Sequence, residues 1–178
     1  MNRNKVRLAQ SLEKLVAQKP LSKLTIGEIC DDAMLSRATF YHHFKDKYDL
    51  VNWIFDCLFD RTFINDNDYA SWEERVIAFL GALKANRHFY TQAYRYNGQN
   101  SLEHHHYNRV YDTYKALFIQ NKGTDMTLEE EYCLEVYCRG AVFVTRQWAM
   151  NGMEQSLDWM TTMFRHAMTD DICSNICN

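Results

Sequence analysis

Residues 25–48, TIGEICDDAMLSRATFYHHFKDKY, decide the fold because they contain two helix starts separated by a short turn. Thr25 is followed three residues later by Glu28, which is the spacing of a capping box at the start of a helix. Ser36 is the expected N-cap of a second, short helix over 37–43. Two capped helices joined by so short a turn are typical of a helix-turn-helix unit.

The second of these helices has the two sides that a DNA-recognition helix needs. Phe40 and Phe44 form an apolar side that can pack on the other helices, and the opposite side is polar. Arg37 can form two hydrogen bonds with guanine, and Thr39 can place its methyl group against thymine. The residues expected to contact DNA are Thr25, Ser36, Arg37, Thr39, Tyr41, His42, His43 and Lys47. The simpler alternative is that the caps only stabilise helices and the charges form a solvated face.

Charge divides the chain at about the same place. Residues 1–47 contain nine Lys or Arg against five Asp or Glu, a net charge of +4, whereas residues 48–178 contain eleven against eighteen, a net charge of −7. A basic end joined to an acidic remainder indicates that one end meets a polyanion. We therefore expect a helix-turn-helix DNA-binding domain at 1–47 and a helical part with a different task at 48–178.

The run SRATFYHHFKDK at 36–47, with Thr25 eleven residues before it, closely resembles the helix-turn-helix signature of the TetR family of transcriptional regulators. Met34 stands where the family usually has glycine in the turn, and Ala38 where it often has glycine. The resemblance implies that Thr25, Ser36, Tyr41, His43 and Lys47 occupy phosphate-contacting positions. It also implies a homodimer that binds a near-palindromic double-stranded DNA operator. By the same resemblance, residues 48–178 form a helical effector-binding and dimerisation domain. The segment YDLVNWIF at 48–55 is similar to a subgroup that includes regulators of dihydroxyacetone kinase operons.

The remainder of the chain also has helical spacing, and no segment alternates cleanly between apolar and polar residues. We therefore predict an all-α fold with no sheet. Gly123 is expected to end one helix, and Thr127 with Glu130 to begin the next. The expected helices cover 2–18, a segment after Thr25, 37–43, a segment from 46, 72–85, 87–96, 102–120, 128–150 and 155–168, with a polar turn at 65–71.

Tyrosines are unusually frequent in the larger part, and each buried hydroxyl requires a hydrogen-bond partner. This favours a cavity or a water-filled space for an effector, although each tyrosine taken singly is more often a core or surface residue. The expected pocket residues are Tyr94, Tyr107, Tyr111, Tyr114 and Tyr137.

The segment 128–150 is apolar nearly all round, so it should be covered on two sides, and Gly140 permits close approach of another helix. A four-helix interface between two copies satisfies this pattern, as does a central helix in a monomeric core. The residues expected at a dimer interface are Val136, Gly140, Val144, Trp148, Leu157, Met160, Phe164 and Met168.

No enzyme motif stands out, and no cofactor is expected. The triplet His104, His105 and His106 is the only feature that suggests a metal-dependent enzyme. Consecutive helical residues point about 100° apart, so we expect no metal site and place the three at the surface or at a pocket rim. The six cysteines should be reduced thiols, because no secretory signal or membrane span is visible and a cytoplasmic location is expected.

The sequence therefore predicts a dimeric, sequence-specific transcriptional regulator whose affinity for DNA is controlled at its C-terminal part. A DNA-organising protein of the same fold, without an effector, is the alternative. The effector can be a small molecule or a partner protein, and its identity, the operator and the direction of regulation are not written in the sequence.

Overall fold

The computed structural model describes residues 2–65 and 69–177, and within them it contains helices and turns but no strand. The predicted all-α fold is therefore confirmed. The expected turn at 65–71 lies partly outside the described residues. The helices are α1 (Arg3–Val16), a 3₁₀ turn η1 (Leu21–Lys23), α2 (Ile26–Asp32), α3 (Arg37–His43), α4 (Lys47–Phe59), a π-helical turn η2 (Asp60–Ile64), α5 (Trp72–Ala85), α6 (Arg87–Arg95), α7 (Leu102–Lys122), α8 (Leu128–Met150), α9 (Leu157–His166) and α10 (Asp170–Ile176).

Side-chain caps fix most of these helix ends where the sequence predicts them. The helices α3, α5 and α8 have the expected bounds. Gly123 ends α7 in the left-handed conformation, with φ of 76°, as expected of a glycine after a helix. At the start of α8, the Thr127 hydroxyl accepts a hydrogen bond from the Glu130 amide, and this capping box is also confirmed.

The C-terminal end differs from the prediction. The expected last helix over 155–168 is shorter, because the Ser156 side chain caps it and α9 begins at Leu157. A further helix, α10, was missed. Thr169 caps α10 by accepting a hydrogen bond from the Ile172 amide, and Ile172 and Ile176 are buried. Seven residues are too few for a clear amphipathic pattern, so this helix depends on packing against α7 and α8.

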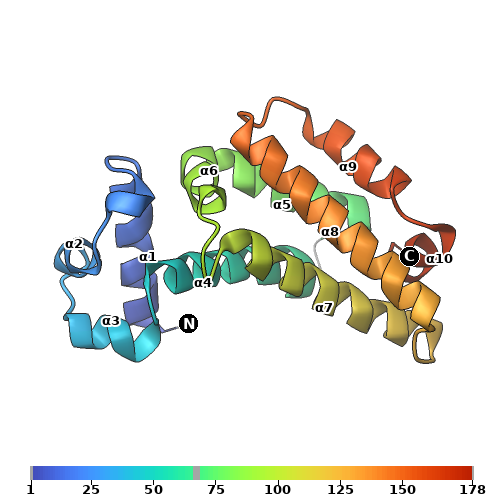
Figure 1. Ribbon diagram of the computed structural model, residues 1–178, viewed down its shortest axis with the longest axis horizontal. Coiled ribbons are helices and arrows are strands. Elements are labelled where there is room, and N and C mark those ends of the chain that lie inside the picture. The colour runs from blue at the N-terminus through green and yellow to red at the C-terminus, as the bar shows by residue number, and fades with distance from the viewer. Residues whose placement is uncertain (1, 66–68, 178) are drawn as a thin grey trace.

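The helices form an arch in which α4 connects the two ends (Figure 1). The helices α1, α2 and α3 pack on one another at the N-terminal end, and α7, α8, α9 and α10 lie at the other end. The α4 helix packs against α1 on one side and against α7 on the other. No helix among the described residues has the length and apolar character needed to cross a membrane.

The N-terminal helices have their own buried apolar cluster. Leu8 and Leu12 on α1 are fully buried and face Ile29 and Phe40, which are also fully buried. The Ser11 hydroxyl on α1 donates a hydrogen bond of 2.9 Å to the Ile29 carbonyl, which satisfies a buried polar group within this cluster. These contacts fix how α2 and α3 are presented at the surface.

Candidate nucleic-acid interface

The start of α2 is closed by the predicted capping box. The Thr25 amide donates to the Glu28 carboxylate at 2.8 Å, and the Glu28 amide donates to the Thr25 hydroxyl at 3.2 Å. Hydrogen bonds from Lys19 and from Thr25 lower the pKa of Glu28 to about 2, so this carboxylate is ionised at neutral pH. Thr25 is therefore held in place at the exposed N-terminus of α2, where backbone amides can meet a phosphate.

The turn between α2 and α3 passes through a left-handed residue. Met34 has φ of 51° and is 81% exposed, and its side chain therefore gains little from packing. The Leu35 amide donates a hydrogen bond of 2.9 Å to the Cys30 carbonyl. This backbone conformation explains why glycine suits the position, since a residue with a Cβ is disfavoured there.

The α3 helix presents the two sides that the sequence predicts. Phe40 and Phe44 are buried against the other helices, while Tyr41 on the opposite side is 58% exposed. Arg37 and His42 are also exposed. The apolar side of α3 is packed and its polar side is exposed. This arrangement allows a helix to insert into a major groove.

Gly27 on α2 makes room for Arg37 on α3. A Cβ at residue 27 would lie 2.5 Å from the Nη2 atom of Arg37, so the guanidinium rests directly against the glycine. Arg37 makes no ion pair or hydrogen bond with the residues that the structure describes, and its donors remain available. The sequence did not indicate this contact, because Gly27 lies within a helix where glycine has no conformational role.

Lys47 has a structural role that the sequence analysis missed. Its ammonium donates to the carbonyl of Leu24 at 2.7 Å and to that of Ser22 at 3.0 Å. Burial lowers its pKa. Two of the three ammonium donors therefore join the start of α4 to the chain before α2, and the expected phosphate contact of Lys47 stays a prediction.

The remaining polar residues of the interface support one another. The Ser36 hydroxyl accepts from the Thr39 amide at 3.0 Å and contacts the Thr39 hydroxyl at 2.9 Å. The rings of His42 and His43 lie 4.8 Å apart, edge to face. Burial, and then the neighbouring His42, lower the pKa of His43, which favours its neutral form at neutral pH. His43 can therefore offer a hydrogen bond to a phosphate without a full charge.

A set of contacts joins this interface to the helices behind it. Asp46 caps α4 and accepts a hydrogen bond of 3.0 Å from the Asn100 side chain. The Asn52 amide group donates to the Asn100 carbonyl at 3.1 Å. The rings of Tyr48 and Tyr96 are stacked, 3.5 Å apart. The segment between α6 and α7 therefore contacts the first turns of α4, immediately after the recognition helix. In the sequence this segment is only the gap between the helices expected at 87–96 and 102–120, and nothing linked it to α4.

The five tyrosines expected to line one effector pocket do not converge. The Tyr94 hydroxyl is buried and hydrogen-bonded to His106 Nδ1 at 2.9 Å, and the Tyr114 hydroxyl accepts from Trp72 at 2.8 Å. Tyr107 and Tyr111 stack on each other near the surface of α7. Tyr114 and Tyr137 border an internal cavity of about 40 Å³, which is room for about one water molecule. Side chains thus satisfy the hydroxyls of Tyr94 and Tyr114, and an effector site at these five tyrosines stays a prediction.

The histidine triplet separates into three environments. His104 is exposed, His105 pairs with Asp56 at 2.8 Å, and His106 is buried among aromatic rings. His106 is therefore not at the surface, and it lines the small cavity beside Tyr114. Burial lowers its pKa to about 3, so it is neutral. Within residues 2–65 and 69–177, no group of three metal-ligating side chains is placed to hold an ion.

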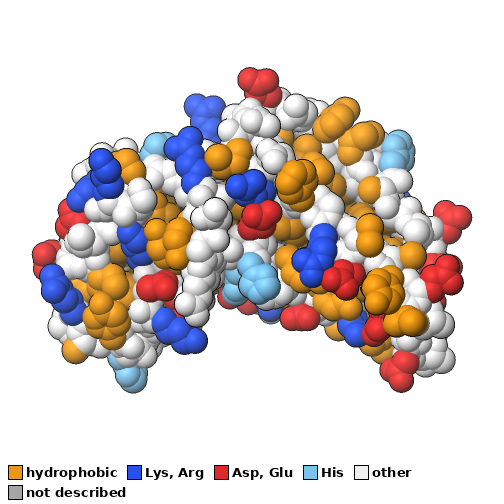
Figure 2. Space-filling view, viewed as in Figure 1, with side chains coloured by type: hydrophobic (Ala, Val, Ile, Leu, Met, Phe, Trp, Pro, Cys, Tyr) orange, Lys and Arg blue, Asp and Glu red, His pale blue; other side chains and the backbone are white. Residues whose placement is uncertain are grey.

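The α8 helix carries an exposed apolar stripe (Figure 2). Val136 is 70% exposed and Val144 is 41% exposed, and the space above Gly140 is open. A groove of about 520 Å³ runs between this stripe and the helices α9 and α10, with Phe164 at its base. The same face has exposed apolar side chains that the sequence analysis did not select, namely Leu128, Tyr132, Phe143 and Trp159.

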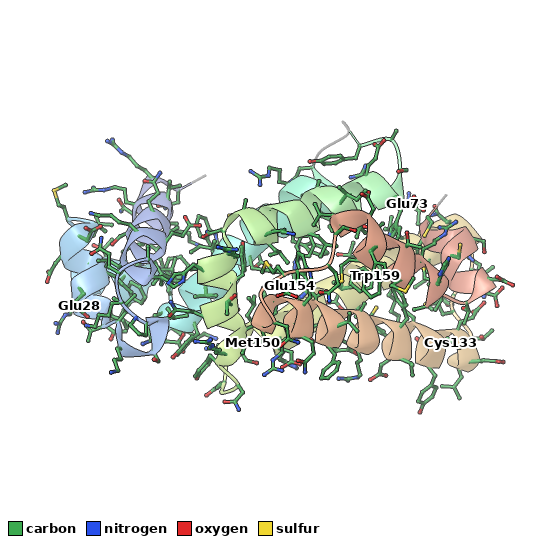
Figure 3. All side chains as sticks on the ribbon, turned by 90° about the horizontal axis from the view of Figure 1, so that it is seen from above. Glu28, Glu73, Cys133, Met150, Glu154 and Trp159 are labelled. Carbon is green, nitrogen blue, oxygen red and sulfur yellow. The ribbon has the colours of Figure 1, made fainter. Side chains whose placement is uncertain are left out.

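Two of the residues expected at a dimer interface lie in the core instead. Trp148 is 3% exposed and Met160 is 1% exposed, so neither side chain can contact a second copy. For Trp148 the reason is that α8 is apolar on both sides, and periodicity does not tell which side faces inward. Met160 lies on α9, which packs against α5. Figure 3 shows α8 between Cys133 and Met150, with Trp159 on the neighbouring α9.

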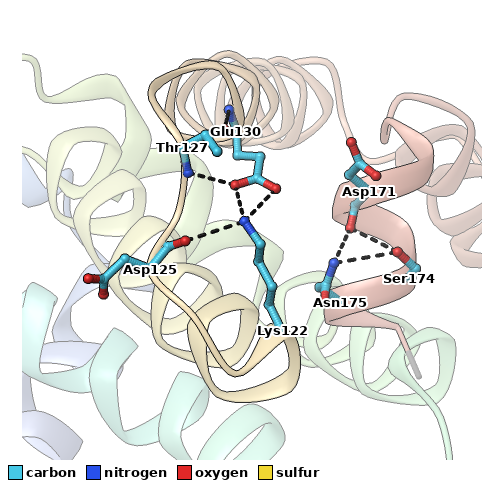
Figure 4. A network of polar contacts seen from close by, with 7 residues as sticks. All are labelled: Lys122, Asp125, Thr127, Glu130, Asp171, Ser174 and Asn175. Carbon is cyan, nitrogen blue, oxygen red and sulfur yellow. Dashed lines mark hydrogen bonds and ion pairs between the residues drawn. The ribbon is translucent and has the colours of Figure 1, made fainter.

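A polar network fixes the end of the groove at the turn between α7 and α8 (Figure 4). The Lys122 ammonium donates to the Glu130 carboxylate at 2.6 Å and to the Asp125 carbonyl at 3.3 Å. The Asn121 side chain donates to the Asn175 carbonyl at 2.8 Å, which holds α10 against α7. These contacts keep the exposed stripe of α8 in a defined position.

Comparison with known proteins agrees with this arrangement. The chain is 23% identical over 151 residues to the HTH-type dhaKLM operon transcriptional activator DhaS of Lactococcus lactis subsp. lactis (strain IL1403), covering 82% of this chain and 79% of that protein. A solved structure of a dihydroxyacetone kinase operon activator DhaS aligns over 98% of this chain and 96% of that one, with a TM-score of 0.69 and 20% identity. A solved structure of Salmonella enterica GusR aligns over 93% of this chain and 95% of that one, with a TM-score of 0.53 and 19% identity.

The family matches cover both ends of the arch. Residues 11–54 match the family described as "Bacterial regulatory proteins, tetR family", which includes the helix-turn-helix unit. Residues 70–170, more than half of the chain, match the family described as "Transcriptional regulator C-terminal region". The chain therefore belongs to the TetR family of DNA-binding transcriptional regulators.

Proposed function

We propose that the protein acts as a homodimer that binds a near-palindromic DNA operator through α3 and regulates transcription in the cytoplasm. Residues 1–47 bind DNA, and residues 48–178 dimerise and receive the regulatory signal. The observation that carries the proposal is the bare polar side of α3, where Arg37 and Tyr41 are exposed while Phe40 on the opposite side is fully buried.

The residues of the interface have different tasks. Arg37 reads a guanine and Thr39 contacts a thymine methyl group. Tyr41 and His42 reach base edges or phosphates, while Thr25, Ser36 and His43 contact phosphates. Lys47 contributes its remaining donor to the DNA backbone and holds α4 in place. DNA affinity therefore depends on both the exposed contacts and the internal bonds that position them.

Dimerisation brings two copies of α3 onto one face of the DNA. Two half-sites are then separated by about one helical turn, roughly 34–36 Å. The apolar stripe of α8, with Val136, Gly140 and Val144, packs on the same stripe of a second copy, and the groove beside Phe164 receives its side chains. Leu157 and Met168, which are partly buried at the ends of α9, lie at the margin of this interface.

Regulation acts on the orientation of α4. A small molecule or partner protein that favours another position of the α6–α7 segment changes the contacts of Tyr96 and Asn100 with α4, and so changes the separation of the two α3 helices.

Selection from a library of random DNA duplexes tests the operator proposal. Full-length protein is immobilised, and the retained duplexes are sequenced over successive rounds. The expected result is enrichment of a near-palindrome whose half-sites are about 10 base pairs apart, centre to centre. Retention without enrichment would instead indicate a DNA-organising protein, and would overturn the proposal of base readout.

Analytical ultracentrifugation tests the dimer interface separately. Val136→Glu places a charge in the centre of the apolar stripe, and the expected result is a monomer at a concentration where the wild type is dimeric. Ile64→Glu is the matched control, because Ile64 is 52% exposed on η2 and lies outside the stripe. Equal dissociation of both variants, or of neither, would contradict this interface.

A further inference from the structure

A cleft of about 350 Å³ lies where the N-terminal helices meet the rest of the chain. Its walls come from α1, the second half of α4, the end of α5 and the start of α6, which lie together near the middle of the arch (Figure 1). It is separate from the small cavity beside Tyr114 and from the α8 groove, with which it shares no lining residue. Its volume is at the lower end of the range for small-molecule sites.

The cleft contains a tyrosine hydroxyl without a protein partner. Tyr90 on α6 is 3% exposed and lines the cleft, and its hydroxyl makes no hydrogen bond with the rest of the described chain. Burial, and then the Glu13 carboxylate, raise the pKa of Tyr90, whereas Arg61 opposes this shift. The phenol therefore lies within the electrostatic reach of both charged groups. This hydroxyl is available for a hydrogen bond to a ligand in the cleft.

Two opposite charges also line the cleft without an ion pair between them. The Glu13 carboxylate on α1 accepts from the Asn86 side chain at 2.9 Å through Oε1, which leaves Oε2 without a partner. Arg61 is exposed on η2, directly after α4, and its guanidinium makes no ion pair or hydrogen bond within residues 2–65 and 69–177. A ligand with both an ammonium and a carboxylate group complements these charges.

The rest of the wall includes aliphatic side chains, with Ile54 and Leu58 on α4 and Ala82 on α5, beside the Cys57 thiol. This surface suits a branched, apolar side chain of a few carbon atoms. We propose that the cleft binds a free amino acid with an aliphatic side chain, with its ammonium group at Glu13 and Tyr90 and its carboxylate at Arg61.

Such a ligand would connect α1 to α4 and α6. The present links across this junction include the hydrogen bond from His88 to the Val16 carbonyl, at 3.0 Å, and that from the Leu21 amide to Gln92, at 2.5 Å. An amino acid held at Glu13 and Arg61 adds a bridge between the DNA-binding helices and the body, and so selects one orientation of α1. The effect on DNA rests on the proposed function, whereas the binding itself does not.

Isothermal titration calorimetry of the full-length dimer, without DNA, tests the site. The probes are L-leucine, 4-methylpentanoate, which lacks the ammonium group, and 3-methylbutylamine, which lacks the carboxylate. We expect L-leucine to bind with a Kd below about 1 mM and each analogue to bind at least about tenfold more weakly. No binding of L-leucine at about 10 mM, or equal binding of the three probes, would overturn the proposal.

Variants locate the binding. Arg61→Gln and Glu13→Gln should each weaken L-leucine binding by about tenfold or more, and Tyr90→Phe by about fivefold. Arg95→Gln is the matched control, because Arg95 is exposed on α6 outside the cleft. This variant should bind L-leucine with the same affinity as the wild type. Circular dichroism checks that each variant is folded. Unchanged affinity in folded Arg61→Gln and Glu13→Gln would overturn the assignment to this cleft.

A DNA titration then tests the regulatory part. With the selected operator, about 5 mM L-leucine should change the Kd for DNA by about fivefold in the wild type and leave it unchanged in Arg61→Gln. Binding of L-leucine with no change in DNA affinity would overturn the regulatory part alone. Failure to bind DNA under any condition would count against the proposed function, and the calorimetric result would still stand.

Discussion

Tyr48 and Tyr96 stack with their ring centroids 3.5 Å apart and their planes 3° from parallel. Tyr48 lies in the first turn of α4, five residues after the end of α3, and Tyr96 follows the last residue of α6. The pair therefore joins the recognition helix to the larger part of the chain through two rigid side chains. Such a stack contributes about 0.5–1.5 kcal/mol beyond the area that it buries.

Gly98→Ala tests this stack without removing either ring. A Cβ at residue 98 would lie 2.7 Å from Tyr96 Cζ, and a ring cannot yield as a flexible chain does. We expect the operator Kd to rise about 2- to 10-fold, because the stack is displaced. Fluorescence anisotropy measures it, and Gly81→Ala, whose Cβ meets only Leu157 at 3.4 Å, is the matched control. Wild-type affinity in Gly98→Ala would show that the stack does not support DNA binding.

Met34→Gly should stabilise the protein. The left-handed φ of 51° is unfavourable for methionine and easy for glycine, and the exposed side chain loses few contacts. The expected gain in the free energy of unfolding is about 0.5–1 kcal/mol, measured by urea denaturation. Met34→Ala keeps the Cβ and should show no gain. A destabilised Met34→Gly variant would indicate that the thioether has a packing role.

Lys47→Met should destabilise the protein in addition to any loss of DNA affinity. The ammonium holds the carbonyls of Ser22 and Leu24, and hydrogen bonds to a charged group contribute about 1.5–3 kcal/mol. We expect a loss of about 1–3 kcal/mol in the free energy of unfolding, again from urea denaturation. Lys45→Met, at an exposed neighbour, should change it by less than about 0.5 kcal/mol. Similar stabilities of the two variants would mean that Lys47 acts on DNA alone.

Because His106 is buried in its neutral form, we expect the protein to lose stability in acid. Its pKa is about 3 in the folded protein against 6.5 for the free side chain, so the unfolded chain binds a proton that the folded protein does not. Stability therefore falls as the pH decreases from about 6.5, by up to about 1.4 kcal/mol per pH unit from this residue.

The matched pair for this prediction is His106→Gln and His104→Gln. Glutamine at 106 stays neutral and can still pair with the Tyr94 hydroxyl. The unfolding free energy of His106→Gln should therefore depend less on pH between 6.5 and 4 than that of the wild type. Glutamine at the exposed position 104 should leave the wild-type slope unchanged. Urea denaturation at several pH values measures both slopes. Parallel pH profiles for all three proteins would contradict the burial of a neutral imidazole.

Local signals in the sequence predicted the interface well. The caps Thr25 and Ser36 and the buried ring of Phe40 are set by neighbours within four residues, and they lie where the sequence places them. The left-handed turn at Met34 could also be found, because the family glycine marks it. These features depend on short-range geometry, which the order of the residues determines.

Long-range partners could not be predicted in the same way. The partners of the tyrosine hydroxyls were not foreseen, because Trp72 and His106, which pair with Tyr114 and Tyr94, are distant from them in sequence. Trp148 was misplaced because α8 is apolar on two sides. The contact between Tyr48 and Tyr96 joins residues almost fifty positions apart, and no periodicity encodes it.

The most direct test of the account is the affinity of wild type and Arg37→Ala for the selected operator and for a scrambled duplex, measured by fluorescence anisotropy at two salt concentrations. If α3 reads bases, Arg37→Ala loses about 1–3 kcal/mol on the operator, or about 5- to 150-fold in Kd, and much less on scrambled DNA. Equal losses on both duplexes would contradict base readout by the exposed side of α3.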